Sequence, residues 1–561
     1  MSIAENRREQ MFPVLSDADR ELARRFASGQ PQRFGPGEVL FALGARGTPA
    51  FLVVSGSIEV VRRDGLGHES VVTQHRAGEF SGEMSQLAGR AAVAEGRAGP
   101  QGCEAVPFDA AHLRALVIGS AELGETVMRA FILRRTSLIA GGGGLILVGP
   151  RDAAALVRLQ GFLSRNSYPH VVLDAAKDET GVEIVTRFGI HPEDMPIVVC
   201  PDGALMRRPN ETELAARLGI TADFEPDRLF DIAVVGAGPA GLATAVYAAS
   251  EGLAVAVLDE RAPGGQAGAS ARIENYLGFP TGISGQALAG RAFTQATKFG
   301  AEIGVPLCVA RLDCGGEDRQ PGQPLKLVLT DGRTIASRAV VIASGARYRK
   351  PPVDNLESFE GAGVSYWASP VEARLCAGEE VALIGAGNSA GQAVAFLAPY
   401  VKRLHLVIRG EGLESSMSRY LIQRIDALPN VVLHRRTEIT AVEGDAAGHL
   451  AKATFRDRAT GGTQSYPLRH LFLFIGADPN TDWLGECGVA VDSKRYVHTG
   501  AADASPAWAA FGRPALPLET SVPGVFAIGD VRSGSTKRVA AAVGEGAAVV
   551  AQIHGMLTAA G

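Results

Sequence analysis

The fold of this chain is decided by residues 231–259, which read DIAVVGAGPAGLATAVYAASEGLAVAVLD. The apolar runs around the glycines predict a buried strand, a helix and a second strand. The glycines permit a tight turn and a close approach of pyrophosphate to the backbone, and the helix N-terminus supplies N–H groups and a positive dipole. We expect a dinucleotide here, held by Gly236, Gly238, Pro239, Ala240 and Gly241, with Asp259 accepting a hydrogen bond from a ribose hydroxyl.

The same pattern returns at residues 381–409, where VALI leads into GAGNSA, an apolar helix and another strand. Arg409 stands where the first copy has Asp259. An acid there favours a ribose hydroxyl, whereas an arginine suits a 2'-phosphate through bidentate hydrogen bonds. We therefore predict FAD at the first site and NADPH at the second, with NADH as the alternative. The expected NADPH contacts are Gly385, Gly387, Asn388, Ser389, Ala390, Arg409, Ser415, Ser416 and Arg419.

Further motifs surround these two turns. They are APGGQAG at 262–268, IENYLGFP at 273–280, ASGA at 343–346, FIGADPN at 474–480 and PGVFAIGDVRSGSTKRVAAAVGEGA at 523–547. Together with the turns they resemble the low-molecular-weight thioredoxin reductases, flavoproteins of the pyridine nucleotide-disulfide oxidoreductase class that use FAD and NADPH. The resemblance covers residues 229–561 and implies an α/β fold with two Rossmann-like domains. FAD would bind to residues 229–348 and 479–561, and NAD(P)H to the inserted residues 349–478.

The resemblance also implies more FAD contacts. Residues of the loop at 264–266 would line the path from adenosine to flavin, Asp530 would accept from the ribityl chain, and the start of the last helix would stabilise the reduced flavin. The full set of these contacts is Gly264, Gly265, Gln266, Asn275, Gly345, Asp530, Arg538, Val539 and Ala540.

The dithiol of thioredoxin reductases has no counterpart here. Those enzymes carry SYCATC between the first FAD segment and the NADPH motif, whereas residues 365–370 read SYWASP, with Trp367 and Pro370 at the cysteine positions. None of the six cysteines forms a C-x-x-C pair. We expect Tyr366 and Trp367 at the reacting centre, with Trp367 either stacked on the flavin as a gate or packed in a core. The nearest thiol, Cys376, is expected to serve packing.

Residues 1–138 form a first block that alternates in its middle and has helical spacing at its ends. Ser55-Gly56 interrupts FLVVSGSIEVVRR, which predicts two strands. PGEVLF, VVSGSIEVVR and AGEFSGEMSQL resemble the cyclic nucleotide-binding domain, a β-rich barrel in which a Gly-Glu pair, here Gly82-Glu83, opens the phosphate cassette. The cassette arginine position holds Ala92, and Arg90 lies two residues early. A cyclic nucleotide, another effector and a regulatory or interface module without a nucleotide are therefore alternatives.

Residues 144–222 alternate strands and helices and resemble a thioredoxin-like or glutaredoxin-like domain, with Met195-Pro196 at the place of its cis-proline. Active members carry C-x-x-C after the first strand, where a helix N-terminus lowers the thiol pKa. Residues 149–152 read GPRD instead. The block cannot perform dithiol chemistry by that route, so we expect it to serve docking.

Composition excludes other classes. A chain of 561 residues with 46% hydrophobic residues is too long to fold around a single hydrophobic core, so we expect several domains. Its net charge of −5, without a run of five like charges, argues against nucleic acid as a partner. No uninterrupted apolar stretch reaches about 18 residues, and the charged start MSIAENRREQ does not resemble a signal peptide. We expect a cytoplasmic homodimer without a membrane segment or a metal site.

Two functions follow from these observations. We favour an NADPH-dependent FAD oxidoreductase that passes electrons to a small molecule or a redox protein. A quinone, a protein docked on residues 144–222 and an external disulfide attacked through Cys376 are alternative acceptors. The other function is a non-catalytic flavoprotein that senses nucleotides as a regulator or scaffold.

Overall fold

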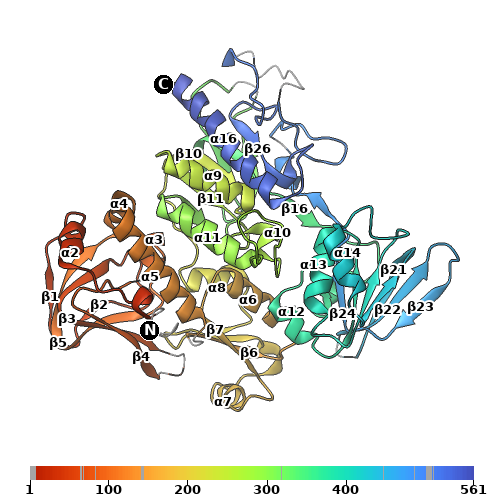
Figure 1. The fold of residues 1–561 in the computed structure, drawn as a ribbon, viewed down its shortest axis with the longest axis horizontal. Helices are drawn as coiled ribbons and strands as arrows, with labels where there is room; N and C mark the ends of the chain where they lie inside the picture. The colour runs from red at the N-terminus through yellow and green to blue at the C-terminus, as the bar shows by residue number, and fades with distance from the viewer. Residues whose placement is uncertain are drawn as a thin grey trace.

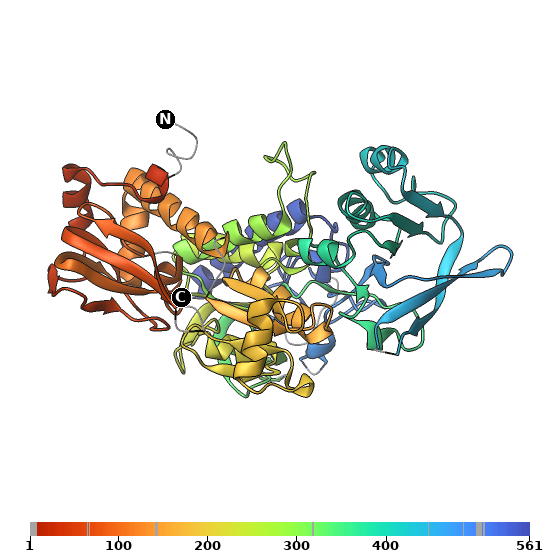
Figure 2. The same ribbon diagram turned by 90° about the horizontal axis from the view of Figure 1, so that it is seen from below.

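The computed structural model describes residues 8–63, 66, 68–82, 84–140, 144–316, 319–446, 448–485, 487–500, 508 and 511–560. A central part, built from two distant chain segments, lies between two lobes (Figure 1). The N-terminal block forms one lobe and residues 364–473 form the other, and the second block lies below the centre. Seen from below, the two lobes lie at opposite ends of the molecule (Figure 2).

The central part is built on a seven-stranded sheet. In spatial order its strands are β12 (Glu302–Gly304), β11 (Val255–Leu258), β10 (Leu229–Val235), β15 (Thr334–Ile342), β14 (Leu325–Leu329) and β13 (Val309–Asp313), and β26 (Val525–Ala527) also pairs with β15. β12, β11, β10, β15 and β26 run parallel, whereas β13, β14 and β15 form an antiparallel meander. The parallel strands are the Rossmann-like arrangement that the sequence predicts.

Helices α9 (Pro239–Ser250), α11 (Gly285–Lys298) and α16 (Val539–Ala560) pack on the central sheet. Their shared core includes Ile232 and Val234 from β10 and Val549 and Ile553 from α16, all fully buried. Short elements α10 (Gly265–Gly268), η3 (Asp482–Leu484) and η4 (Gly529–Val531) connect these layers. The last helix of the chain is therefore part of the same core as the first glycine turn.

The second Rossmann-like part is a sheet of five parallel strands. In spatial order they are β17 (Val364–Ser365), β24 (His470–Leu473), β18 (Glu380–Ile384), β19 (Arg403–Val407) and β20 (Val431–His434). Helices α12 (Pro370–Leu375), α13 (Asn388–Leu397) and α14 (Arg419–Asp426) pack in one core against it, and the antiparallel strands β21 (Thr437–Gly444), β22 (Leu450–Asp457) and β23 (Thr463–Tyr466) contribute to a second.

Two antiparallel strands, β16 (Ala346–Tyr348) and β25 (Ala477–Pro479), connect the two Rossmann-like parts. An ion pair between Arg349 and Asp478 (2.5 Å) lies beside them. The 3₁₀ turn η2 (Leu356–Phe359) follows β16. The chain thus leaves the central part through β16 and returns to it through β25, and the two strands lie side by side.

The N-terminal block contains an antiparallel sheet of β1 (Gln32–Phe34), β2 (Val39–Phe41), β3 (Ala50–Arg63), β4 (Glu69–Arg76) and β5 (Glu95–Phe108), with helices α2 (Asp17–Arg24), α3 (Met84–Ala88), α4 (Ala110–Gly119) and α5 (Ala121–Ala140). Its described strand pairings run β1-β5-β3-β4, with β2 on β5, and do not close into the predicted barrel. The prediction of two strands over FLVVSGSIEVVRR is wrong, because β3 is continuous. Gly56 (φ +71°) lies between two register shifts, so it marks a bulge rather than a break.

The second block is a four-stranded sheet in the order β7 (His170–Asp174), β6 (Leu145–Gly149), β8 (Ile197–Val199) and β9 (Leu205–Arg207). β6 and β7 are parallel and the other pairs are antiparallel. Helices α6 (Ala154–Arg165), α7 (Glu179–Arg187) and α8 (Glu211–Arg217) and the turn η1 (Pro192–Asp194) complete it. The Met195–Pro196 peptide bond is cis, which confirms that prediction.

One helix of the described residues is long and apolar enough to cross a membrane, by length and composition only. It is Val539–Thr558 of α16. Glu545 interrupts this run and pairs with Arg532 (2.7 Å), and Val549, Val550 and Ile553 lie in the core against α9. The apolar composition of α16 thus serves packing on the central sheet.

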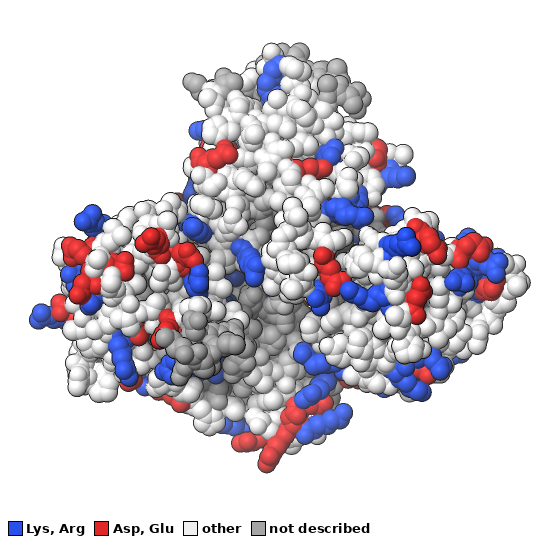
Figure 3. All heavy atoms as spheres, in the orientation of Figure 1, with Lys and Arg blue, Asp and Glu red and all other residues white. Residues whose placement is uncertain are grey.

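Charges of both signs alternate over the two lobes on the face seen in Figure 3, and the upper end of the central part carries few. No patch of one sign dominates that face. The distribution agrees with the small net charge of −5.

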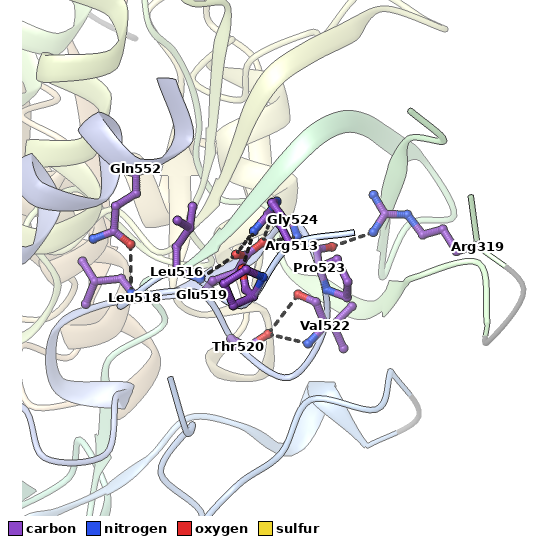
Figure 4. A network of polar contacts seen from close by, with 11 residues as sticks. Arg319, Arg513, Leu516, Leu518, Glu519, Thr520, Val522, Pro523, Gly524 and Gln552 are labelled. Carbon is purple, nitrogen blue, oxygen red and sulfur yellow. Dashed lines mark hydrogen bonds and ion pairs between the residues drawn. The ribbon is translucent and has the colours of Figure 1, made fainter. Parts of the chain in front are cut away.

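A buried carboxylate holds the loop that precedes β26. Glu519 is fully buried and accepts two hydrogen bonds from Arg513 (2.7 and 2.8 Å) and one each from the N–H groups of Leu516 (3.0 Å) and Gly524 (2.7 Å) (Figure 4). Around it, Gln552 of α16 accepts from Leu518 N–H (2.9 Å), and Arg319 donates to the Pro523 carbonyl (2.6 Å). This network ties the loop before β26 to α16 and to the meander.

We expect Arg513→Ala to destabilise the central part by about 3 kcal/mol, because it leaves the Glu519 carboxylate buried without its cation. The control is Arg333→Ala, which removes the exposed pair with Asp331 and should cost less than about 1 kcal/mol. Urea denaturation followed by circular dichroism measures both. Equal effects of the two variants would contradict the role given to the Glu519 network.

Candidate active site

The first glycine turn follows β10 and contains two positions where only glycine fits. Gly236 has φ +107°, and a Cβ there would lie 2.3 Å from the carbonyl oxygen of Ala343. A Cβ on Gly241 would lie 1.9 Å from the carbonyl oxygen of Gly236. Both contacts are with backbone atoms, which cannot move aside, so these glycines fix the turn.

Gly238 is different, because a side chain there would enter open space. The nearest atom to a Cβ on Gly238 would be the Cα of Gly265, at 4.0 Å. Gly238 is the N-cap of α9, and no side chain caps that helix. Its first-turn N–H groups, those of Ala240 and Gly241 after Pro239, are available to a phosphate group. The turn is therefore a cradle that fits the diphosphate of a dinucleotide.

Asp259 braces this cradle. One of its carboxylate oxygens accepts from the N–H of Ala237 (2.8 Å), and the other accepts from the N–H groups of Arg261 (2.9 Å) and Ala262 (3.0 Å). A carboxylate has about four acceptor positions, so one is left for a ribose hydroxyl. The ribose contact stays a prediction, and the bracing role is one that the sequence did not indicate.

The loop at 264–266 forms the opposite wall. Gly264 N–H donates to the Ala237 carbonyl (2.7 Å), and the Gln266 amide donates to the Ala346 carbonyl. A Cβ on Gly265 would lie 3.1 Å from the Cα of Gly238. The structure therefore brings the predicted loop residues against the first turn.

Two further predicted FAD residues follow strands at the same edge of the sheet. β26 is parallel to β15, so the segments after them, with Asp530 and Gly345, share the carboxyl edge with the first turn. Burial raises the pKa of the Asp530 carboxyl, and no described side chain donates a hydrogen bond to it. Asn275 and Arg538 are exposed, and Val539 and Ala540 begin α16.

The second glycine turn repeats the geometry of the first. Gly385 has φ +148°, and a Cβ there would lie 2.4 Å from the carbonyl oxygen of Phe474. Gly387 is the N-cap of α13, again without a side-chain cap, and nothing lies within 4 Å of a Cβ built on it. Ser389 and Ala390 continue the first turn of α13. The second site can therefore receive a diphosphate in the same way.

The segment at 413–418 closes over the second turn. Asn388 accepts from Ser418 N–H (2.7 Å), and Ser416 donates to the Ala386 carbonyl (2.8 Å). These two predicted NADPH residues hold the segment in place. Ser415 and Arg419 are exposed beside them.

Arg409 is exposed after β19, and two more arginines gather near it. Arg436 N–H donates to the Gly410 carbonyl (3.0 Å), and the Arg458 guanidinium donates to the Arg409 carbonyl (3.3 Å). Arg436 follows β20 and Arg458 follows β22, so only the sheet topology brings them together. Sequence reasoning missed both, because neither belongs to a motif.

The segment at residues 365–370, which reads SYWASP, packs beside the connection between the two Rossmann-like parts. The Trp367 indole N–H donates to Glu372 (3.1 Å), and the ring of Trp367 lies 6.3 Å from that of Tyr348 in β16. Tyr366 stacks on Tyr348 (5.8 Å) and donates to Glu360 (2.6 Å). An aromatic group of Tyr348, Tyr366 and Trp367 therefore lies beside the connection between the two Rossmann-like parts.

Cys376 does not offer a reactive thiol. It is fully buried, and burial raises its pKa to about 12. Since the thiolate is the nucleophile, an attack on an external disulfide through Cys376 is not supported. The expected packing role agrees with its place in the core of the second Rossmann-like part.

Comparison with known protein families gives a match for the two Rossmann-like parts and one for the N-terminal block. Residues 230–546 match the family model described as pyridine nucleotide-disulphide oxidoreductase. The chain belongs to this family. Residues 31–119 match the cyclic nucleotide-binding domain. Its predicted Glu83 lies outside the described residues, and Ala92, at the cassette arginine position, is buried.

Relatives of this oxidoreductase include several thioredoxin reductases. The thioredoxin reductase of Bacillus subtilis is 28% identical over 324 residues, 57% of this chain and 92% of its own length. The thioredoxin reductase of Mycolicibacterium smegmatis is 30% identical over 318 residues, 57% of this chain and 93% of its own length. The crystal structure of T. acidophilum thioredoxin reductase is matched over 59% of this chain and 100% of its own, with 28% identity and a TM-score of 0.52.

Family membership confirms the main predictions for the enzyme. The chain is an NAD(P)H-dependent FAD oxidoreductase, and FAD and NADPH are the cofactors of its family. The cradle at Gly238 and the open N-cap at Gly387 fit these two dinucleotides. The individual contact residues stay predictions.

Two matched substitutions test the cradles. Gly238→Val and Gly387→Val each place a branched side chain in open space, so the fold should survive while the diphosphate is excluded. We expect Gly238→Val to be purified without flavin and Gly387→Val to stay yellow but to be no longer reduced by NADPH. Absorbance at the flavin band and anaerobic titration measure both. Wild-type flavin content in Gly238→Val would refute the first site.

Proposed function

We propose that this enzyme takes a hydride from NADPH onto FAD and passes the two electrons to an acceptor other than a dithiol of its own. The observation that carries the proposal is the pair of matched open cradles beside a reacting segment without cysteine at Trp367 and Pro370. Bound FAD supplies the hydride and electron transfer, whereas the residues of the chain orient the cofactors and exclude water. The acceptor is a redox protein, such as thioredoxin, or a small molecule such as a quinone.

The preference for NADPH is supported by the arginines around Arg409. Among the described residues, Arg436 and Arg458 each pair with one carboxylate, Glu411 at 3.8 Å and Glu438 at 3.5 Å, and Arg409 has no carboxylate within 4 Å. The resulting positive group suits a 2'-phosphate, which carries more charge than a ribose hydroxyl. We assign Arg409, Ser415 and Arg419 to this phosphate side of the site.

The two N-terminal blocks are proposed as docking and effector modules. The strand order of residues 144–222 and the cis-proline support a thioredoxin-like domain without a dithiol. Residues 1–138 would carry a cyclic nucleotide or another effector, and residues 229–348, 349–478 and 479–561 would form the FAD, NAD(P)H and second FAD segments. A homodimer in the cytoplasm is part of the same proposal.

A non-catalytic sensor is the second candidate, and one contact favours it. The Arg90 guanidinium lies 4.5 Å from the ring centroid of Phe293 in α11, so the arginine two residues before the cassette arginine position packs on the FAD part. Such an interface could report an effector without turnover. The matched cradles favour the enzyme.

An anaerobic experiment tests the proposed function. Purified yellow protein is mixed with NADPH or NADH, and the loss of flavin absorbance is followed before quinones, thioredoxin and low-molecular-weight disulfides are added. We expect bleaching by NADPH and reoxidation by at least one acceptor without a new free thiol on the enzyme. Bound flavin that neither nucleotide reduces would favour the sensor.

We expect Arg409→Ala to weaken the affinity for NADPH by about 10- to 150-fold and to leave the affinity for NADH nearly unchanged. The reason is that a charge-assisted contact to the 2'-phosphate contributes about 1.5 to 3 kcal/mol. Arg403→Ala is the control, since Arg403 is exposed at the opposite end of β19. Michaelis constants for both nucleotides measure the effect. An equal loss for NADPH and NADH would mean that Arg409 holds structure only.

We expect Trp367 to act on the flavin side of the connection between the two Rossmann-like parts. Trp367→Ala should change the rate of flavin reduction by more than it changes the melting temperature, and flavin binding should quench tryptophan emission. Trp367→Phe keeps a ring but loses the bond to Glu372, so it separates stacking from hydrogen bonding. Stopped-flow reduction and thermal melting are the measurements.

Restoring the two cysteines tests the same placement. Pro370 is the first residue of α12 and Ser369 caps it, so a thiol at position 370 would lie at a helix N-terminus, where its pKa falls. The double variant Trp367→Cys, Pro370→Cys should gain NADPH-dependent reduction of an aromatic disulfide. No gain, together with unfolding of Trp367→Ala, would show that the segment does not face the flavin.

A further inference from the structure

The end of helix α6 connects the second block to the first glycine turn. Three consecutive residues there bond to the FAD part, and Figure 1 places α6 below α10 and α11. Their bonds run from the Gln286 amide to the Ser164 carbonyl (2.5 Å), from the Arg165 guanidinium to the Gly265 carbonyl (3.0 Å), and from the Asn166 amide to the Arg261 carbonyl (3.1 Å). The contact therefore reaches the loop that forms one wall of the cradle.

Arg165 is a half-buried cation with few hydrogen-bond partners. Of its five N–H donors, one bonds to Gly265, and its buried Nε has no partner. No carboxylate of the described residues lies within 4 Å of its guanidinium, although Asp259 and Glu211 attract it from further away and Arg261 repels it. A guanidinium that is half-buried, with its Nε shielded from water and no anion in contact, points to an anionic partner.

The place of Arg165 indicates which anion this is. A Cβ built on Gly265 would lie 3.1 Å from the Cα of Gly238. The Gly265 carbonyl, which Arg165 contacts, therefore belongs to the wall of the diphosphate cradle. The N–H groups of α9 supply only a partial positive charge to a diphosphate. A guanidinium matches phosphate oxygens in charge and in geometry.

We propose that Arg165 is a cofactor-binding residue that the second block supplies to the FAD diphosphate, so that this block completes the FAD site. The proposal rests on the FAD site of the proposed function. It gives the cysteine-free block a role that needs no thiol. The family match begins at residue 230, so Arg165 lies outside the part of the chain that the family shares.

The test measures FAD affinity rather than turnover. The full-length apoprotein and its Arg165→Gln, Arg165→Lys and Arg158→Gln variants are titrated with FAD, and flavin fluorescence gives the dissociation constant at two salt concentrations. Arg158 is the matched control because it lies exposed on the same helix. We expect Arg165→Gln to raise the dissociation constant by about 10-fold or more and to reduce its salt dependence, Arg165→Lys to recover part of the loss, and Arg158→Gln to match wild type.

Thermal melting of the apoproteins separates binding from interface stability. Glutamine is two bonds shorter than arginine and loses the contact with the Gly265 carbonyl, but the bonds at Ser164 and Asn166 remain. The apo melting temperature of Arg165→Gln should therefore stay near that of wild type. Equal FAD affinity of Arg165→Gln and wild type would overturn this proposal and leave the FAD site intact. A loss that Arg165→Lys does not recover, or one that follows a lower apo melting temperature, would also overturn it. Wild-type apoprotein that binds no FAD would overturn the proposed function itself.

Discussion

A backbone contact too close for any side chain governs both halves of the oxidoreductase. Gly236 and Gly385 each bring the turn after a strand against a carbonyl oxygen that follows the neighbouring strand, that of Ala343 and that of Phe474. Because no Cβ fits, the chain turns sharply, and the next helix starts with its N-terminus at the carboxyl edge of the sheet. Asp530, Gly345 and Arg409 all follow parallel strands, so the same constraint determines which edge of each sheet they join.

The sequence predicted what is local and periodic. Both glycine turns and the parallel strands follow from short-range patterns, whereas the cis bond before Pro196 follows from the resemblance to thioredoxin-like domains, and the structure has all of them. It could not indicate that Arg436 and Arg458 join Arg409, because strand order decides that contact. β3 was split in the prediction because a glycine at a bulge has the same signature as a glycine at a turn.

The segment at residues 365–370 leads into a well-formed helix start although it contains no cysteine. Ser369 still caps α12, with Glu372 bonded back to its N–H (2.9 Å), so the helix that would activate a thiol begins in place at Pro370. Glu372 also accepts from Trp367, which binds the aromatic group to the capping box. Local folding of this segment therefore depends on the cap and on packing, and it does not need sulfur.

Helix α11 is the surface on which both added blocks meet the FAD part. Gln286 bonds to α6, and Phe293, two turns further along, lies under Arg90 of the N-terminal block. Between them, Ala289 contacts the 264–266 loop closely, since a Cβ on Gly264 would lie 2.4 Å from the Ala289 Cβ. A displacement of α11 by either block would thus be transmitted to the wall of the diphosphate cradle, because the packing there leaves no free space to absorb it. Contacts from both blocks therefore lie two turns apart on the one helix that packs against the wall of the cradle.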